Sequence, residues 1–302
     1  MDTRTSKSRH PHNVTLKEMV QSYLYHVENT LAPRTLESYA TSLALFVAFC
    51  GDVPGEDVTD LHVVRWMKSR LDEGKAPNTV RSDYRRLRYG FFSWAVERGH
   101  VGRNWAALAK PPSEPDEPGR SIGDRELGRL LLATSGSRTE FRDRALLLLL
   151  WDTGMRIGEL SQVALGDIDL TESVVHVRAE ITKTNQERWV PFRGECRAAM
   201  HDYLAFERGM EPGPLFLSSR NGKAFHEQTA KHVVREIGIR AGVKVGAHDF
   251  RRALVERLQR EGMPDTLVMR ITGHRSVAMV VRYGKRVAND NAILAYRRAM
   301  GR

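Results

Sequence analysis

The stretch ALLLLLWDTGMRIGEL, residues 145–160, joins an apolar run to a glycine turn and then to a charged segment. The run from Ala145 to Trp151 is far shorter than the ~20 apolar residues that span a bilayer, so it predicts a helix buried inside a soluble domain. The glycine that follows ends this helix, and a second helix begins behind it. Arg156 and Glu159 stand three residues apart there, so the carboxylate can hold the guanidinium in one orientation. Taken alone, such a pair is more often a surface ion pair.

A proline-rich segment, KPPSEPDEPGR at residues 110–120, lies upstream of this stretch. Four prolines and the lack of apolar side chains predict an extended connection between domains. A chain of 302 residues suits two domains of roughly 100–200 residues each. We therefore expect a flexible N-terminus at residues 1–12, a first domain at 13–110, a linker at 111–120 and a second domain at 121–302.

The spacing of apolar residues predicts the secondary structure of both domains. In residues 13–110 they recur at three and four spacing, and Gly or Pro breaks divide the pattern into about four helices. In the second domain two β-like runs, Val174–Arg178 and Arg188–Phe192, interrupt an otherwise helical pattern. The expected fold class is therefore mainly α with a small antiparallel β-sheet.

The composition of the chain indicates which class of partner it binds. Lys and Arg outnumber Asp and Glu by 47 to 37, a formal net charge of +10, and clustered cations bind nucleic acid by releasing its counterions. Residues 1–12 lack the apolar stretch of a secretory signal. Cys50 and Cys196 are the only cysteines, which indicates neither a disulfide framework nor a zinc ribbon. We expect a protein of the reducing cytoplasm, without a membrane anchor, that acts on nucleic acid.

A basic helix is predicted from about Asn78 to Arg98, in the first domain. Its first half carries four arginines against one aspartate. Such a face is either a solvated helix surface or a set of contacts to a DNA backbone, and the net charge favours DNA. The candidate DNA-binding residues are Arg81, Arg85, Arg86 and Arg88.

Further side chains stand in motifs that are weak one by one. Lys183 lies in the polar turn between the β-like runs, where a lysine is ordinarily solvated. His248 and Arg251 share a helix face at i, i+3, which sets a proton-transfer group beside a bidentate phosphate ligand. His274 follows a glycine, and Tyr283 comes nine residues later, on a short helix where a lone tyrosine is usually structural.

The order of these motifs along the chain carries more weight than any one of them. An arginine in a TGxR turn, a hairpin lysine, HxxR, GH and a tyrosine nine residues on resemble the tyrosine recombinases, also called phage integrases. The resemblance covers nearly the whole chain and implies a helical, SAM-like core-binding domain at 13–110 and a catalytic domain at 121–302. Two positions depart from the family: Arg252 stands where many members have His, and Gln186 replaces a second basic residue. The implied catalytic residues are Arg156, Lys183, His248, Arg251, His274 and Tyr283.

The chemistry of a phosphodiester explains the need for such a set. Negative charge on the phosphate grows as a nucleophile adds, so Arg156 and Arg251 are assigned to the non-bridging oxygens. A tyrosine, with an ordinary pKa near 10, needs help to lose its proton, and we assign His248 as general base and His274 as a donor to the phosphate. Lys183 is assigned to protonate the leaving 5′ oxygen.

The resemblance also implies partners. Four protomers would synapse two double-stranded DNA attachment sites as a homotetramer, with host DNA-bending or directionality factors as further candidates. The segment 288–300, with Ile293, Leu294 and Tyr296, is the expected docking helix between protomers. The sequence has no HExxH, no glycine-rich phosphate loop and no carboxylate cluster of a nuclease, so neither a metal nor another cofactor is expected.

Several functions share this chemistry. We favour an integrase of a phage or mobile element without an arm-binding domain, because about twelve residues precede the first expected helix. A Xer-like recombinase would resolve chromosome or plasmid dimers by the same steps. A type IB topoisomerase would relax any supercoiled DNA. A non-catalytic DNA-binding protein would keep the fold, but it would have no need of all six catalytic positions.

Overall fold

The computed structural model describes residues 14–113, 119–284 and 288–300. The chain divides into two compact units, Met1–Asp116 and Glu117–Arg302, named here the N-terminal and C-terminal units. The predicted flexible N-terminus, residues 1–12, lies outside the described residues, as does the middle of the predicted linker, residues 114–118.

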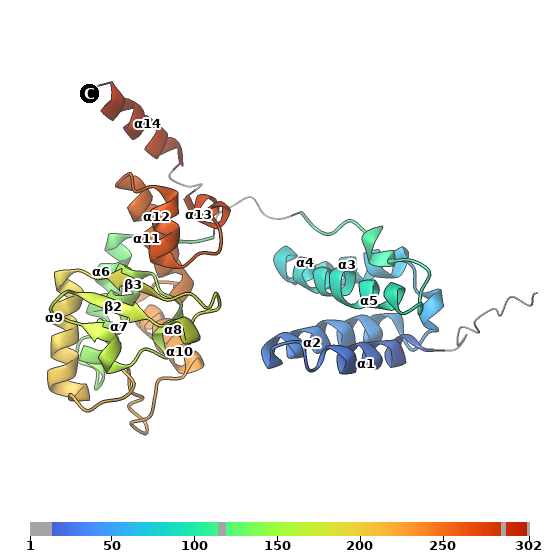
Figure 1. Ribbon diagram of the computed structural model, residues 1–302, viewed down its shortest axis with the longest axis horizontal. Helices are drawn as coiled ribbons and strands as arrows, with labels where there is room; N and C mark the ends of the chain where they lie inside the picture. The colour runs from blue at the N-terminus through green and yellow to red at the C-terminus, as the bar shows by residue number, and fades with distance from the viewer. Residues whose placement is uncertain (1–13, 114–118, 285–287, 301–302) are drawn as a thin grey trace, which may run out of the picture. The chain divides into compact units, whose positions relative to one another are not determined.

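The N-terminal unit is helical in its described part (Figure 1). The segments α4, η2 and α5 follow one another without a break, and η2 is a π-helical turn. The elements in chain order are α1 (Leu16–Val27), α2 (Pro33–Cys50), η1 (Gly55–Asp57), α3 (Asp60–Asp72), α4 (Pro77–Arg86), η2 (Leu87–Phe91), α5 (Phe92–Glu97) and η3 (Trp105–Ala107).

Local signals start these helices. The Thr15 hydroxyl accepts a hydrogen bond from the backbone N–H of Glu18, whose carboxylate accepts one from the backbone of Thr15, so the two residues form a capping box for α1. Pro33 and Pro77 are the first residues of α2 and α4. A backbone N–H at that position has no partner within the helix, so the lack of one in proline breaks no hydrogen bond. The apolar faces meet in a core with many aromatic rings, such as Phe46 and Trp66 at 5.3 Å between centroids. About four helices were predicted here, and α1, α2, α3 and the α4–α5 run are present.

The C-terminal unit combines helices with one small sheet (Figure 1). Its helices are α6 (Asp124–Leu132), α7 (Glu140–Thr153), α8 (Ile157–Leu160), η4 (Leu165–Asp167), η5 (Ala179–Ile181), α9 (Gly194–Tyr203), η6 (Leu204–Arg208), α10 (Glu227–Ala241), α11 (Ala247–Arg260), α12 (Asp265–Thr272), α13 (Val277–Gly284) and α14 (Ala288–Ala299). Its strands are β1 (Ile168–Asp169), β2 (Val174–Val177) and β3 (Arg188–Pro191).

The sheet is antiparallel in the order β1-β2-β3. The register of β2 and β3 pairs Val175 with Val190, both buried, and His176 with Trp189, whose ring is exposed. This alternation is the period of a strand with one face against the core. The fold class predicted from the sequence is thereby confirmed. The two-residue strand β1 was not predicted, because so short a run shows no alternation.

Helix α7 is buried along its C-terminal half and packs against α6, α9, α11 and β3. It ends at Gly154, whose φ of +54° lies in the left-handed region that glycine tolerates. A Cβ at Gly154 would lie 2.8 Å from Cδ2 of Leu254, so the turn passes close against α11. This close approach brings the residues after α7 to the helix that carries His248 and Arg251. The buried helix predicted from the run 145–151 is confirmed. In the described part of the chain, no helix is both long and apolar enough to cross a bilayer.

Candidate active site

The buried carboxylate of Glu159 lies between the half-buried Arg156 and the largely buried Arg188, beside the end of α7. The Glu159 carboxylate, 2% exposed, accepts hydrogen bonds from the backbone N–H and Nη1 of Arg156 at 2.9 and 2.7 Å. It also accepts one from Nη2 of Arg188 at 2.6 Å. Burial would raise the pKa of Glu159, but the hydrogen bonds and charges of the two arginines outweigh it and lower that pKa. The contact predicted between Arg156 and Glu159 is therefore present, and it orients the Arg156 guanidinium.

Arg251 is buried, with 1% of its surface exposed. Its Nη1 donates to the carbonyl oxygen of Gly154 at 3.0 Å, and its Nε donates to Nε2 of His274 at 3.2 Å. Nη2 has no hydrogen-bond partner within the described residues. Burial, and then the charge of Arg156, lower the pKa of Arg251 to about 9. A buried guanidinium with an unused donor is suited to bind an anion.

The imidazole of His274 is held by hydrogen bonds at both nitrogens. Because Arg251 can only donate, Nε2 of His274 is the acceptor and the neutral ring carries its proton on Nδ1. Nδ1 then donates to the hydroxyl oxygen of Thr272 at 2.6 Å, and that hydroxyl donates to the carbonyl oxygen of Val268. In this arrangement His274 positions Arg251. To donate a hydrogen bond to a phosphate from Nε2, the His274 ring would have to give up its contact with Nε of Arg251.

Tyr283 lies on α13 with its ring between the two imidazoles. Its hydroxyl oxygen is 2.8 Å from Nε2 of His248, and the ring centroids are 5.6 Å apart. The centroid of the His274 ring lies 5.1 Å from that of Tyr283. The structure thus brings together five of the six predicted catalytic residues: Arg156, His248, Arg251, His274 and Tyr283.

Both imidazoles favour the neutral form. Burial, followed by the charges of neighbouring arginines, lowers the pKa of His248 to about 4 and that of His274 to about 3. His274 is only 6% exposed. The side chain of His248 is exposed by its surface area, so water weakens the effect of burial and of the neighbouring charges on the pKa of His248. A neutral imidazole has one nitrogen free of a proton, so His248 can accept a proton from the Tyr283 hydroxyl.

Lys183 lies apart from this cluster. It is exposed on the loop between η5 and β3, and no hydrogen bond or ion pair involves its ammonium group within the described residues. Its carbonyl oxygen accepts a hydrogen bond from Nη2 of Arg275 at 2.8 Å, which ties the loop to the residue after His274. The next residues of the loop line a cleft of about 820 Å³ that also reaches Gly273 and His274. The loop borders the site, and a catalytic role for Lys183 stays a prediction.

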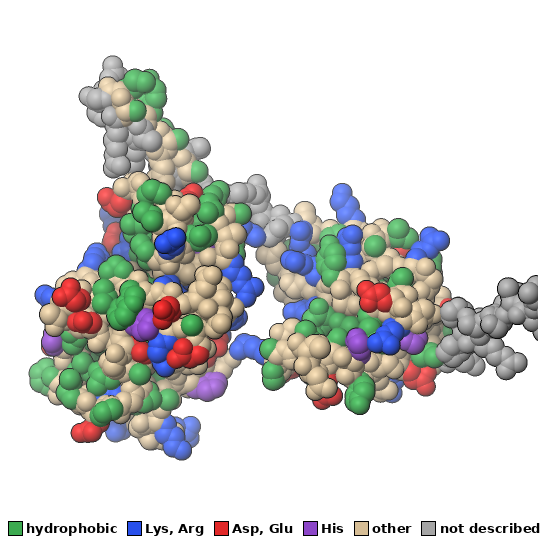
Figure 2. All heavy atoms as spheres, viewed as in Figure 1, with side chains coloured by type: hydrophobic (Ala, Val, Ile, Leu, Met, Phe, Trp, Pro, Cys, Tyr) green, Lys and Arg blue, Asp and Glu red, His purple; other side chains and the backbone are tan. Residues whose placement is uncertain are grey.

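The arginines predicted to contact DNA differ in their surroundings. Arg81, Arg85 and Arg88 recur at the spacing of one helix face, and Lys and Arg side chains gather over the α3 and α4 region in Figure 2. Arg86 instead pairs with the buried carboxylate of Asp83 at 2.9 Å. Arg86 therefore also stabilises the packing of the N-terminal unit. The sequence did not predict this structural role. DNA binding by all four arginines stays a prediction.

Two residues of the site were not singled out by the sequence motifs. Arg188 was assigned only to a strand, yet it holds Glu159 and donates from Nε to the carbonyl oxygen of Ile271 at 3.1 Å. Thr272 fixes the tautomer of His274. A basic residue at an inward-facing strand position is the signal that could have pointed to Arg188 once the register was known, because inward positions of β2 and β3 are otherwise valines.

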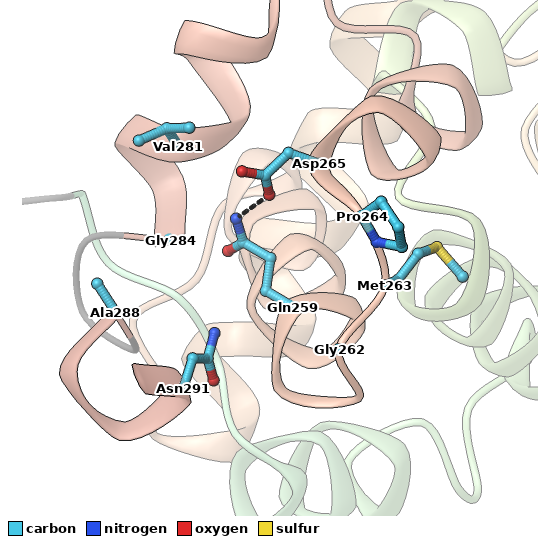
Figure 3. Close-up of a pocket in the computed structure, with 9 residues that line it drawn as sticks. All are labelled: Gln259, Gly262, Met263, Pro264, Asp265, Val281, Gly284, Ala288 and Asn291. Carbon is cyan, nitrogen blue, oxygen red and sulfur yellow. Dashed lines mark hydrogen bonds between the residues drawn. The ribbon is translucent and has the colours of Figure 1, made fainter. Parts of the chain in front are cut away.

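A pocket of about 350 Å³ is lined by residues of α11, α12, α13 and α14 (Figure 3). Gln259 of α11 donates from its amide to Asp265 of α12 at 2.7 Å in the pocket wall. Ala288 and Asn291 of α14 line the same pocket, and α14 contacts α11. Further along α14, Ile293 and Tyr296 are exposed, and the side chain of Leu294 lies outside the described part. The docking role of residues 288–300 stays a prediction.

The fold and this cluster define a class of protein, a DNA strand transferase of the tyrosine type. Residues 120–289 match the model of the phage integrase family, and the chain belongs to that family, the tyrosine recombinases.

Similar proteins agree with this family. The tyrosine recombinase XerC of Pelobacter propionicus is 27% identical over 300 residues, which cover 94% of this chain and 95% of the relative. The integrase of transposon Tn1549, solved with transposon right end DNA, superposes with a TM-score of 0.78 at 17% identity over 95% of this chain and all of the other. A lambda integrase tetramer on a Holliday junction gives a TM-score of 0.76 at 20% identity, covering 90% of this chain and 78% of the other. At these identities the two solved structures show a shared fold.

Proposed function

We propose that this chain is a site-specific DNA recombinase that cleaves and rejoins strands through a 3′-phosphotyrosine on Tyr283, and that it integrates or excises a phage or mobile element. The observation that carries the proposal is the 2.8 Å contact between the Tyr283 hydroxyl and Nε2 of His248. This pair lies close to Arg251, a buried cation with an unused donor. A nucleophile, a base and an anion ligand therefore meet at one place.

In the cleavage step the Tyr283 oxygen attacks the scissile phosphorus while its proton passes to Nε2 of His248. A bond forms from phosphorus to the phenolic oxygen, and the bond to the 5′ oxygen breaks. Arg156 and Arg251 stabilise the added negative charge because their donors are already held in place. Lys183, on its exposed loop, supplies the proton that leaves with the 5′ oxygen.

Rejoining is the reverse of cleavage. A 5′ hydroxyl from another strand returns its proton to the neutral Lys183 amine as its oxygen attacks the phosphotyrosine, the bond from phosphorus to the phenolic oxygen breaks, and the phenolic oxygen leaves with the proton held on His248. The ester keeps the free energy of the phosphodiester, so the exchange needs no ATP. The proposed partners are double-stranded attachment sites, bound by the arginines of α4 and η2 together with the C-terminal unit. A homotetramer on two such sites, assisted by host DNA-bending or directionality factors in the cytoplasm, is part of the proposal, and the fold shared with a tetramer on a Holliday junction supports it.

A covalent trapping experiment on a pool of DNA sequences tests the function and finds the target site at the same time. The full chain is incubated with nicked duplexes whose central sequence is randomised, so that the short fragment beyond the cut diffuses away and the protein stays attached. Adducts are isolated under denaturing conditions and their DNA is sequenced. We expect enrichment of one sequence and attachment of its 3′ phosphate to Tyr283, located by mass spectrometry.

Matched variants make the result specific. Tyr283→Phe should form no adduct, while Tyr25→Phe, which changes an exposed tyrosine of α1, should react like the original chain. Arg156→Ala should slow adduct formation roughly 10²- to 10³-fold, the usual effect of removing one donor to a transition-state oxyanion. An adduct that persists in Tyr283→Phe, or a folded chain that forms none with any sequence of the pool, contradicts the proposal.

The relatives favour a second candidate within the same chemistry. Two curated relatives named XerC, from Pelobacter propionicus and Corynebacterium glutamicum, each match 94% of this chain, which supports a Xer-like recombinase that resolves DNA dimers. The enriched sequence distinguishes the two roles: a site in the chromosome's own dimer-resolution region indicates a Xer-like role, whereas a site at the border of a mobile element indicates an integrase. Relaxation of supercoiled plasmids that lack the enriched sequence would instead indicate a type IB topoisomerase.

A further inference from the structure

Arg252 follows Arg251 on α11 and contacts three separate parts of the C-terminal unit. Its Nη1 donates to Oδ1 of Asp249 at 3.0 Å and to the carbonyl oxygen of Arg120 at 3.1 Å. Its guanidinium carbon lies 5.7 Å from the centroid of the Tyr283 ring, within reach of a cation–π interaction. Arg252 therefore joins the first turn of α11, the end of the predicted linker and the proposed nucleophile.

Gly119 packs directly against the same guanidinium. A Cβ built on Gly119 would lie 2.6 and 2.7 Å from the two terminal nitrogens of Arg252, closer than a Cβ atom comes to its neighbours in proteins. Any larger residue at position 119 would therefore displace the Arg252 side chain. Residues 119 and 120 are the first described residues after 114–118, in the chain that connects the two units. The position of this segment and the position of the guanidinium are thus mechanically linked.

The charge of Arg252 also reaches the base. After burial, it is the largest of the causes that lower the pKa of His248 to about 4. The other titratable groups that face His248 are Tyr283 of α13, Arg251 of α11, Arg156 before α8 and His274 after α12. The charges of Arg251 and Arg156, like that of Arg252, lower the pKa of His248. Removal of Arg252 would therefore let His248 take up a proton at a higher pH.

We propose that Arg252 is a positioning residue that ties the ring of Tyr283 to the segment 119–120, so that this segment sets the orientation of the nucleophile. The inference rests on the proposed recombinase function. The guanidinium is held from one side by the Arg120 carbonyl and by Gly119, and it holds the phenol ring on the other. A displacement of the segment would move the guanidinium and release the ring.

The rate of adduct formation on the enriched nicked duplex tests this link. Arg252→Ala should slow cleavage about 2- to 30-fold, the rate equivalent of one cation–π contact. It should also move the acid limb of the pH–rate profile to higher pH. Arg252→Lys keeps the charge and should leave the acid limb in place. Gly119→Ala should slow cleavage in the original chain, because it displaces the guanidinium, and should have no effect in the Arg252→Ala background.

Gly128→Ala is the matched control, since a Cβ there meets nothing within 4 Å; it should cleave at the original rate. Thermal unfolding of each variant shows that the unit remains folded. If the original chain forms no adduct at Tyr283, the proposed function fails and this inference falls with it. If the original chain forms the adduct while Arg252→Ala matches it in rate and acid limb, the inference alone is overturned. Independent, multiplying effects of Gly119→Ala and Arg252→Ala also overturn it.

Discussion

Replacement of Glu159 by Gln tests how the site holds its arginines. The substitution keeps the shape of the side chain and removes one negative charge that lies between two cations. In the structure the carboxylate accepts from Arg156 at 2.7 Å and from Arg188 at 2.6 Å. The amide can accept from one guanidinium only, and its NH₂ group would face the other. The variant therefore leaves a buried cation without its counter-charge.

The expected loss of stability follows from burial. Glu159 is 2% exposed and Arg188 is 9% exposed, so water compensates little of the lost attraction. Breaking a buried ion pair by removing one partner costs about 3–5 kcal/mol. For a unit of this size each kcal/mol lowers the melting temperature by roughly 2–4 °C, so we expect a drop of roughly 6–20 °C.

Thermal unfolding followed by circular dichroism and tryptophan fluorescence measures this drop. Glu195→Gln removes the carboxylate of an exposed pair with Arg144 and should cost less than about 1 kcal/mol. The double variant Glu159→Gln with Arg188→Met removes the surplus charge as well, and it should be more stable than Glu159→Gln alone. If the double variant is no more stable, unpaired charge is not the cause and the reasoning is refuted.

Three further predictions concern other parts of the chain. Gly154→Ala should lower the free energy of unfolding by more than about 1 kcal/mol in urea titrations, because of its positive φ and a clash with α11. The pKa of His274 is lowered to about 3, so only the unfolded state takes up its proton below about pH 6.5; urea titrations should show stability falling as pH drops from there toward 3. Arg85→Ala should reduce the salt dependence of DNA binding by about one charge, whereas Arg86→Ala should also lower the melting temperature of the N-terminal unit.

Short-range signals were enough to predict most of the helices. The apolar run 145–151 and the glycine after it predicted α7 and its end, because burial and chain reversal each leave a local mark. The order of motifs from Arg156 to Tyr283 pointed to the site, although each residue alone had an ordinary structural explanation. The geometry now shows why the order was informative, since five of those residues converge on the ends of four helices and the turns between them.

Contacts between residues that are far apart in the sequence leave no local sequence pattern, so they could not be predicted. Arg188 reaches Glu159 only because the register of β2 and β3 turns it inward, and no local pattern distinguishes it from a solvated strand residue. Arg86 looked like its neighbours in the sequence, yet it turns toward Asp83. The departure at Arg252 was visible in the sequence, but its link to residue 119 depends on how the connecting chain passes over α11.

The unused donors of the site connect stability to substrate binding. Arg251 Nη2 and Arg188 Nη1 are both buried without a hydrogen-bond partner among the described residues. Burial and repulsion from Arg156 lower the pKa of Arg251 to about 9, so the folded protein holds this cation against an unfavourable field. A phosphate diester would accept from the unused donors and bring a negative charge, which relieves both effects at once. Glu159 and the carbonyl oxygen of Gly154 already hold the guanidinium groups of Arg156 and Arg251, and donors that are oriented before charge develops on the phosphate give the largest electrostatic stabilisation of a transition state.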